Sequence, residues 1–323
     1  MKAIARDTYG PADGLELRDI DRPEIGGDEV LIRVHAAGLD RGVWHVMTGL
    51  PYPIRLAGFG FRAPKNPVPG ADLAGVVEAV GSEVTRFQVG DEVFGVGKGA
   101  FAEYARAPED KLAPKPANLT FEQAATVGIS GSTALQALRD HAKVEAGQSV
   151  LIIGASGGVG TYAVQLAKVF GAEVTAVCST SKVEMVRALG ADHVIDYTQA
   201  DFATSGLRYD AILDIGGNAS LARLRRTLAP EGTLVIAGGE TSGRWLGGTD
   251  RQVRALVLSR FIGQTLKTFV AKENHEDLLV LKELIEAGKV TPAIDRAYPL
   301  AEAPDAISYL VQGRARGKVV ITV

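Results

Sequence analysis

A run of glycines between residues 147 and 160 has the composition of an anion-binding turn. The apolar stretch from Ser149 to Ile153 is typical of a buried strand, and a helical pattern of apolar residues begins at about Val159. Backbone N–H groups at a helix N-terminus bind phosphate oxygens, and intervening Cβ atoms would keep a pyrophosphate out of reach. The spacing G-x-x-G-x-x-G therefore predicts a dinucleotide site, with the alternative of a tight strand-to-helix turn that binds no ligand. Its expected members are Gly154, Ser156, Gly157, Gly158, Val159 and Gly160.

About 20 residues after this turn, the chain carries hydroxyls and a cation where an NAD-binding protein carries a carboxylate. The strand predicted over Glu173–Cys178 is followed by Ser179, Thr180, Ser181 and Lys182. Hydroxyl and ammonium groups suit a ribose 2′-phosphate, which a carboxylate would repel. The sequence therefore favours NADPH as the cofactor. In the alternative interpretation, Ser179 and Ser181 only cap the helix that follows.

The chain contains few cysteine and histidine residues that could bind a metal ion. A single cysteine, Cys178, permits no intrachain disulfide and no zinc site with two thiolates. The five histidines, at positions 35, 45, 141, 193 and 275, lack the i, i+3 or i, i+4 spacing of a metal-binding helix. We therefore expect no built-in metal.

The overall composition is that of an ordinary globular protein. The 323 residues are 46% hydrophobic and 23% charged, with a net charge of −3, and this length suggests two domains. Charges of both signs are spread evenly, so we expect no nucleic-acid partner. The first ten residues lack the apolar core of a secretory signal, and no stretch approaches the ~20 apolar residues of a membrane span. We therefore expect a soluble cytoplasmic protein that makes no membrane contact.

The elements that must position the glycine turn follow two different patterns. Residues 1–119 consist of short β-rich runs separated by glycine and proline, which is typical of a compact β domain. From 120 to 270, amphipathic helices alternate with continuous apolar strands, which predicts a parallel sheet covered on both faces. The terminal run GKVVITV is again strand-like, so residues 271–323 are expected to return to the first domain. The expected fold class is thus α/β, with a β domain and a doubly wound parallel-sheet domain.

The residues around the glycine turn also resemble a known family. Gly147-Gln148, Leu151, Ala155–Gly158, Gly160, Gln165 and Lys168 match the signature of the quinone oxidoreductase and ζ-crystallin group of medium-chain dehydrogenase/reductases. The resemblance continues through the segments G-A-D-L-A-G, V-G-D-E-V and G-R-A-R-G-K, which end at Gly75, Val93 and Lys318. It implies a GroES-like β-barrel catalytic domain, a Rossmann NADPH-binding domain and a homodimer joined through the segment FIGQTLKTF. The implied reaction is NADPH-dependent reduction of a quinone or an α,β-unsaturated carbonyl (enone).

The resemblance implies further cofactor contacts. Thr133 aligns with a threonine that lies against the nicotinamide, and Tyr197 stands where related enzymes add a phosphate contact. The remaining implied contacts are Ile215, Gly216, Ala237, Gly238, Gly239 and Lys318. The segments at 215–216 and 237–239 follow strands, at the edge of an α/β sheet where ligands bind, although they are equally well explained as turns.

The catalytic place differs from that of zinc-dependent relatives. Where those enzymes carry cysteine and histidine ligands, this chain has Asp40 and the segment Gly70-Ala71-Asp72, so zinc alcohol dehydrogenase chemistry is not expected. Asp40, Trp44, His45 and Tyr52 are the candidate catalytic residues. His45 is a candidate proton donor, because an unperturbed imidazole titrates near neutral pH. A structural His45, with the cofactor ribose or water as donor, is the alternative.

The sequence leaves the substrate and the occurrence of turnover open. The proline-rich, aromatic segment 49–69 is either a lid that selects the substrate or a surface loop packed on its own aromatics. Reduction of an enoyl thioester would need cations for a pantetheine phosphate, and Arg55, Arg62 and Arg244 are available. A cofactor-binding protein without turnover is a further possibility.

Overall fold

The computed structural model describes residues 1–217, 219–238, 243 and 245–323, and the chain forms two compact units. Unit 1 comprises Met1–Ser132 and Glu273–Val323, and unit 2 comprises Thr133–Lys272. The division lies later than the boundary expected after residue 119. The reason is that helix α2 (Phe121–Ala124), with a capping box at Thr120, packs on strands of unit 1. The C-terminal strand belongs to unit 1, where the sequence pattern placed it.

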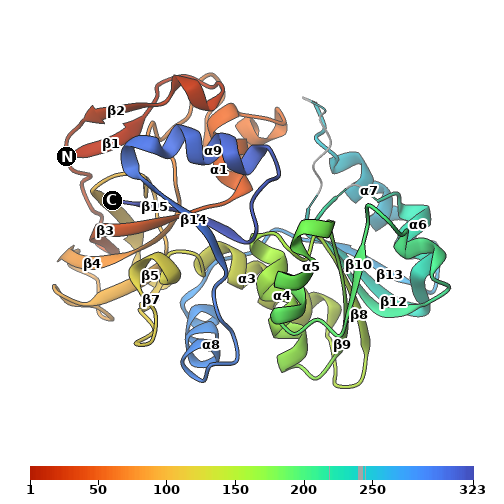
Figure 1. Cartoon of the computed structure of the whole chain (residues 1–323). Coiled ribbons are helices and arrows are strands. Elements are labelled where there is room, and N and C mark those ends of the chain that lie inside the picture. Colours follow the sequence, from red (N-terminus) through yellow and green to blue (C-terminus); the bar gives the residue numbers. More distant parts are fainter. Residues whose placement is uncertain (218, 239–242, 244) are drawn as a thin grey trace. The chain divides into compact units, whose positions relative to one another are not determined.

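Unit 1 is built on an antiparallel-rich sheet with the strand order β14-β15-β3-β4-β5-β7, in which β6 also pairs with β3 (Figure 1). Two further strands, β1 and β2, form a separate antiparallel pair. The strands are β1 (Lys2–Ala5), β2 (Glu16–Asp19), β3 (Glu29–Leu39), β4 (Asp72–Val80), β5 (Glu92–Val96), β6 (Tyr104–Pro108), β7 (Leu112–Pro114), β14 (Ile294–Pro299) and β15 (Lys318–Thr322). This sheet is the compact β domain that the short β-rich runs predicted.

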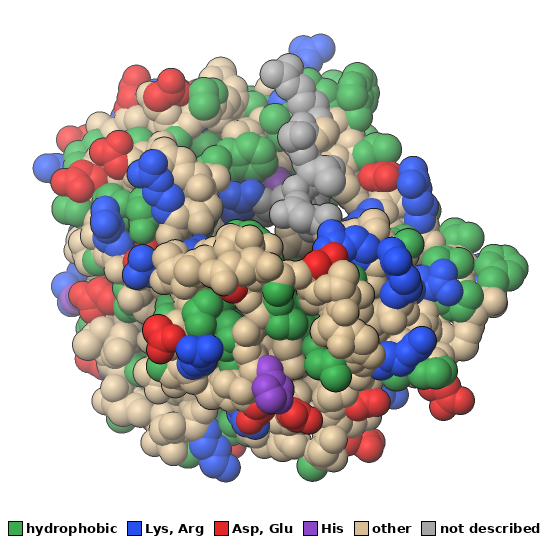
Figure 2. Space-filling model, turned by 45° about the vertical axis from the view of Figure 1, so that its right-hand side comes forward, with side chains coloured by type: hydrophobic (Ala, Val, Ile, Leu, Met, Phe, Trp, Pro, Cys, Tyr) green, Lys and Arg blue, Asp and Glu red, His purple; other side chains and the backbone are tan. Residues whose placement is uncertain are grey.

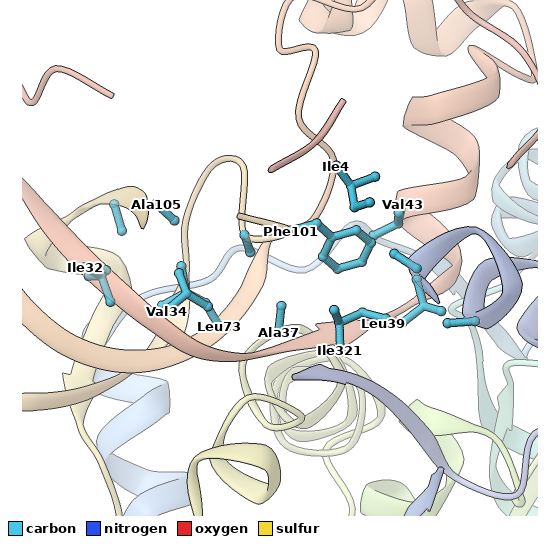
Figure 3. Close-up of a cluster of buried hydrophobic side chains, with 14 of the residues drawn as sticks. Ile4, Ile32, Val34, Ala37, Leu39, Val43, Leu73, Phe101, Ala105 and Ile321 are labelled. Atoms are coloured by element: carbon cyan, nitrogen blue, oxygen red, sulfur yellow. The ribbon is translucent and has the colours of Figure 1, made fainter. Parts of the chain in front are cut away.

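The core of unit 1 lies between this sheet and the helices that pack on it. Figure 3 shows the ring of Phe101 among Ile4, Val43 and Leu39, all of which are buried. The helices of this unit are α1 (Arg41–Thr48), α2, α8 (His275–Glu286) and α9 (Ala303–Val311), while α3 (Gly128–Gln136) spans the division between the units. Buried residues alternate with half-buried ones along β6, whereas β5 and β15 are buried over most of their length.

Unit 2 is a six-stranded parallel sheet with the order β10-β9-β8-β11-β12-β13. The strands are β8 (Ser149–Ile153), β9 (Glu173–Cys178), β10 (His193–Asp196), β11 (Tyr209–Asp214), β12 (Leu228–Ile236) and β13 (Thr265–Thr268). Figure 1 shows helices on both faces of this sheet, namely α4 (Gly158–Val169), α5 (Val183–Ala188), α6 (Leu221–Thr227) and α7 (Thr249–Leu258). The strand order reverses direction between β8 and β11, which is where ligands of doubly wound sheets bind. The predicted α/β fold class is confirmed.

The surface shows the mixed charge that the composition predicted. Figure 2 shows acidic and basic side chains on the same face of the molecule. None of the helices in the described part of the chain has the length and apolar character needed to cross a bilayer.

Candidate functional site

The glycine turn lies between the end of β8 and the start of α4, as its spacing predicted. Gly154 has φ +87°, in the left-handed region that favours glycine. A Cβ on Gly160 would lie 2.2 Å from the carbonyl oxygen of Gly154, and a Cβ on Gly154 would lie 3.0 Å from the nitrogen of Gly216. These two glycines are therefore required by the close packing of the protein backbone itself.

Gly157 differs from its neighbours because the protein leaves space beside it. A Cβ there would meet only the Gly154 carbonyl oxygen, at 3.5 Å. Gly157 caps α4, whose first N–H groups, on Gly158, Val159 and Gly160, lack acceptors in the preceding turn of the helix. Open space beside N–H groups at the positive end of a helix fits the approach of a pyrophosphate. The turn therefore fits the dinucleotide that the sequence predicted. In a turn that binds no ligand, a larger residue would fit at position 157, because the space beside Gly157 is open.

Two more predicted segments lie beside this turn. The N–H groups of Ile215 and Gly216 both donate to the carbonyl oxygen of Ile153, at 3.0 and 3.1 Å. The N–H groups of Ala237 and Gly238 donate to the carbonyl oxygen of Asp214, at 3.0 and 3.2 Å. The carboxyl ends of β8, β11 and β12 thus bring these segments together. Gly239 lies outside the described residues.

A buried ion pair that the sequence did not predict supports these strand ends. Asp214, the last residue of β11, is fully buried, and its Oδ2 lies 2.7 Å from Nη1 of Arg251 in α7. Arg251 also donates to the carbonyl oxygens of Ala219 (2.6 Å) and Gly238 (3.2 Å). Burial raises the pKa of the Asp214 carboxyl, and the Arg251 charge opposes that shift. The only local signal for such a pair is a charged residue at the end of an apolar strand.

The residues predicted at the 2′-phosphate gather at the ends of β9 and β10. The N–H of Tyr197 donates to the carbonyl oxygen of Cys178 (3.0 Å), which places Tyr197 next to the segment that begins at Ser179. The side chain of Tyr197 is 63% exposed. Ser179 begins the turn Thr180–Lys182, but its hydroxyl makes no capping hydrogen bond, and α5 begins after Lys182 without a side-chain cap. The interpretation of this segment as a mere helix cap is therefore wrong for Ser179.

Asp196 is a further residue of this region that the sequence did not single out. Its carboxylate accepts hydrogen bonds from the hydroxyls of Thr180 and Thr198, and these bonds lower its pKa. The Thr180 hydroxyl is therefore engaged within the protein. The contacts of Ser179, Lys182 and Tyr197 with a 2′-phosphate stay predictions.

The candidate catalytic residues of unit 1 lie on α1 and the loop that follows it. Asp40 caps the helix, with its Oδ1 accepting from the N–H of Val43 at 3.3 Å. The rings of Trp44 and His45 meet edge to face, with centroids 5.0 Å apart. Thr133, the predicted nicotinamide neighbour, is half-buried on α3 and is the first residue of unit 2. The structure thus brings Asp40, Trp44 and His45 together on a single helix.

Tyr52 is linked to this helix through Arg55. The Arg55 guanidinium lies 4.9 Å from the ring centroid of Tyr52 and 4.4 Å from that of Tyr9, and its Nε donates to the carbonyl oxygen of Gly49 (2.9 Å). The Tyr9 hydroxyl donates to the carbonyl oxygen of Gly60 at 2.6 Å. Segment 49–69 is therefore pinned to the C-terminus of α1 and to Tyr9, while its Phe59 is exposed. It also exposes Leu56 (76%) and Phe61 (70%), so a role in selecting the substrate stays a prediction.

The hydrogen bonds of His45 bear on its predicted role as a proton donor. Its Nδ1 lies 2.8 Å from the carbonyl oxygen of Leu50, and a carbonyl can only accept, so Nδ1 carries the proton. Burial lowers the pKa of the imidazole, with a further contribution from Arg41, while the Leu50 bond and Asp40 oppose the shift. Above about pH 6.5, its ordinary pKa, the ring is therefore neutral, with a lone pair on Nε2. In this state Nε2 accepts protons, which disfavours His45 as the donor.

We expect His45→Asn to keep turnover within about twofold of the wild-type value from pH 6.5 to 9. Asparagine retains an N–H that can donate to Leu50, and the lowered pKa leaves no imidazolium to lose in this range. Steady-state kcat measured against pH checks the expectation, with His45→Ala as the companion variant that removes the tether to Leu50. A tenfold drop in kcat for His45→Asn, with loss of an ionisation from the profile, would establish His45 as the donor.

A second buried ion pair includes Asp72, which directly follows Ala71 in the segment where the family resemblance implies a lost histidine ligand. Nζ of Lys318 lies 2.9 Å from Oδ2 of Asp72 and 3.2 Å from the hydroxyl of Ser130, and both charged residues are at most 1% exposed. The other Asp72 oxygen accepts from the N–H of Ile129 at 2.6 Å. The ammonium of Lys318 is thus bound within unit 1, and its predicted contact with the cofactor stays a prediction.

Asp40 completes this charged group. Burial raises the pKa of Asp72 to about 6, with the Lys318 charge opposing the shift and the Asp40 carboxyl adding to it. The second carboxyl oxygen of Asp40, Oδ2, is buried and has no hydrogen-bond partner among the described residues. Within those residues, no group of three or more His, Cys, Asp and Glu side chains is placed to hold a metal ion.

Comparisons with known proteins match segments of both units. Residues 26–117 match the family described as "Alcohol dehydrogenase GroES-like domain", and residues 189–321 match "Zinc-binding dehydrogenase". The "NADPH-dependent alkenal/one oxidoreductase, chloroplastic" of Arabidopsis thaliana is 36% identical over 99% of this chain and 79% of its own length. The "Quinone oxidoreductase" of Homo sapiens is 31% identical over 99% of this chain and 97% of its own.

The fold comparison covers both units. The structure of the quinone oxidoreductase from Coxiella burnetii has a TM-score of 0.87 and 31% identity, and the match covers 100% of this chain and 99% of that one. Agreement in sequence and fold from end to end is far more specific than a shared glycine turn. This chain therefore belongs to the quinone oxidoreductase group of the medium-chain dehydrogenase/reductase superfamily.

Proposed function

We propose that this protein is an NADPH-dependent reductase of quinones or α,β-unsaturated carbonyls that works without zinc. The observation that carries the proposal is the buried pair of Asp72 and Lys318. A carboxylate that is already neutralised by an ammonium 2.9 Å away is a poor ligand for a divalent cation, which the same ammonium repels. Without a Lewis acid to polarise a carbonyl, the substrate must itself be electrophilic, as quinones and enones are.

The residues of each unit would then have separate tasks. When bound, NADPH supplies the hydride that adds to the quinone or to the β-carbon of the enone. The open side of Gly157 and the N–H groups of α4 would hold the pyrophosphate, while Ser179, Lys182 and Tyr197 would hold the 2′-phosphate. Trp44 and Tyr52 would line the substrate side, and rigid positioning of the reactants would supply much of the rate enhancement. Water or a ribose hydroxyl would supply the proton, since His45 is held as an acceptor.

We expect the purified protein to prefer NADPH to NADH and Lys182→Glu to reverse that preference. The variant places a carboxylate in the turn that follows Ser179, where it would repel a 2′-phosphate and accept a hydrogen bond from a ribose 2′-hydroxyl. The loss of one charge-assisted contact is expected to weaken NADPH binding about 10- to 100-fold. Fluorescence titration with both cofactors measures the change, and Lys168→Glu, a charge reversal at a residue paired with Asp192, is the control. A wild-type preference for NADH would contradict the assignment.

The reaction itself is tested by NADPH oxidation, followed at 340 nm, with a panel of quinones, 2-alkenals and enoyl thioesters. Turnover of quinones or alkenals supports the proposed function. Turnover restricted to enoyl thioesters would favour the enoyl-thioester alternative. Of the three arginines available to that alternative, Arg55 is stacked between tyrosines, Arg62 is exposed and Arg244 lies outside the described residues. Binding of NADPH without oxidation by any acceptor would favour a protein without turnover.

We also propose that the chain forms a homodimer through β13. This strand ends the sheet of unit 2 and pairs only with β12 among the described residues, so one of its edges is open. Large apolar side chains are exposed on and around α7, namely Leu246, Val253, Leu256, Val257 and Phe261. We expect light scattering to give a dimer mass, and Val257→Asp to shift it towards the monomer. A monomer at micromolar concentration of the wild-type protein would contradict the proposal.

A further inference from the structure

Three arginines surround an open depression on unit 2, away from the cofactor segments. The depression has a volume of about 520 Å³, within the range of small-molecule sites. Arg208, Arg225 and Arg226 line it together with the apolar groups of Ala222, Pro230 and Ile262. Three of the eight lining residues are thus arginines, and Gly263 and Gln264 complete the wall.

Each guanidinium is held in place by a hydrogen bond to a neutral acceptor. Nη1 of Arg208 donates to the carbonyl oxygen of Leu228 (3.4 Å), and Nε of Arg226 donates to that of Ala222 (3.3 Å). Nε of Arg225 donates to Oε1 of Gln264 at 3.1 Å. Gln264 is 9% exposed, and its Nε2 is fixed in turn by the carbonyl oxygens of Arg225, Leu228 and Ala229. Arg225 is thus oriented through Gln264, whereas Arg208 and Arg226 are exposed and each makes one longer hydrogen bond to a carbonyl oxygen.

No carboxylate neutralises this arginine cluster. Among the described residues, Arg208, Arg225 and Arg226 take part in no ion pair with Asp or Glu, and none of the residues that line the depression is acidic. Asp201, whose pKa Arg226 helps to lower, is paired with Arg223 at 2.6 Å. Three like charges around one depression repel one another, and a bound anion relieves that repulsion.

The arginine cluster lies at the opposite edge of the sheet from the cofactor segments. Arg208 directly precedes β11, Pro230 lies in the first residues of β12, and Gln264 directly precedes β13. The glycine turn and the segments at 215–216 and 237–238 instead follow the ends of their strands. Because all strands of this sheet are parallel, the two sets of residues are separated by the length of the strands.

We propose that Arg208, Arg225 and Arg226 bind a small oxyanion that carries at least two negative charges on an apolar body. The fork of a guanidinium group matches the paired oxygens of a phosphate and of a carboxylate. The proposed ligand is therefore defined by its oxyanion charge, which either group can supply. The apolar part of the wall, formed by Ala222, Pro230 and Ile262, would contact the apolar body of the ligand. This site is independent of the proposed reaction.

The test is isothermal titration calorimetry of the full chain, with and without NADPH, using phenyl phosphate and phthalate as probes. Both probes join a ring to two negative charges, and they distinguish a phosphate from a dicarboxylate source. We expect one of them to bind with a 1:1 stoichiometry that NADPH does not change, and inorganic phosphate to bind at least tenfold more weakly. Raising the salt concentration is expected to weaken the binding.

The variants separate this site from general surface charge. Arg226→Gln, which loses only a bond within its own helix, and the triple variant R208Q/R225Q/R226Q are each expected to weaken the probe at least tenfold. Arg223→Gln, on the same helix but paired with Asp201, is the control and should stay within twofold of wild type. The proposal is overturned if neither probe binds, if Arg223→Gln has the same effect, or if NADPH competes. Binding of a single-stranded oligonucleotide in place of both probes would overturn it as well.

Discussion

Lys318→Met is expected to lower the free energy of unfolding by about 3–5 kcal/mol at pH 7.5. Methionine fills much of the space of the lysine stem but removes the ammonium that lies 2.9 Å from Asp72. Asp72 is fully buried, so its carboxylate would be left without a counter-charge in a low-dielectric environment. Urea unfolding followed by circular dichroism measures the change.

The partner variant separates the loss of the pair from the loss of packing. Asp72→Asn keeps an oxygen for the N–H of Ile129, so Asp72→Asn with Lys318→Met should recover most of the lost stability. Lys282→Met is the matched control, because it removes an ion pair with Glu286 on the surface of α8. That pair is expected to contribute about 0.3–0.5 kcal/mol. A cost for Lys318→Met as small as that of Lys282→Met would show that the buried pair does not stabilise unit 1.

The same pair predicts a pH dependence with a definite sign. The pKa of Asp72 is about 6 in the folded protein, above the ordinary value of 3.8, so the folded state binds this proton more tightly than the unfolded chain does. The stability that protonation of Asp72 contributes is fully present below pH 3.8 and is lost as the pH rises through about 6. The cost of Lys318→Met should therefore shrink when the pH is lowered from 7.5 to 5, because protonated Asp72 needs no counter-charge. A cost that does not change with pH would show that Asp72 keeps one protonation state.

The parts of this fold that the sequence predicted are those encoded by neighbouring residues. A continuous apolar run such as Ser149–Ile153 signals a buried parallel strand, and the glycines that follow it signal the turn into α4. A local signal of the same kind occurs at Thr120, whose hydroxyl caps α2 at the N–H of Gln123 in the next helical turn. These signals lie within a few residues of one another, so periodicity and turn chemistry suffice to find them.

The buried ion pairs could not be predicted in the same way. Lys318 and Asp72 are 246 positions apart, and neither residue differs from a surface lysine or aspartate in its local sequence. Their meeting depends on the return of β15 to the sheet of unit 1, between β14 and β3. Which ring nitrogen of His45 carries the proton could not be predicted for the same reason, because the carbonyl of Leu50 determines it in the folded loop.

Gly157→Ala is expected to leave the stability of the protein unchanged and to weaken NADPH binding by about 10- to 100-fold. The backbone of Gly157 is extended (φ −86°, ψ 176°), which alanine adopts without strain, and its Cβ would touch the protein only at 3.5 Å. The added methyl would instead occupy the open space beside the N–H groups of α4. Thermal unfolding and fluorescence titration with NADPH measure the two effects separately.

Gly160→Ala is the matched variant, because it adds the same methyl group one turn further into the helix. Its Cβ would lie 2.2 Å from the carbonyl oxygen of Gly154, so α4 must move away from β8. Overpacking of this kind typically costs about 1–3 kcal/mol of stability, and the displaced helix should also bind NADPH less well. The two variants should therefore differ in stability. Both should lose affinity for NADPH only if a pyrophosphate approaches Gly157. If Gly157→Ala bound NADPH as tightly as wild type, the turn would be explained by backbone packing alone, and the cofactor would have to be held elsewhere.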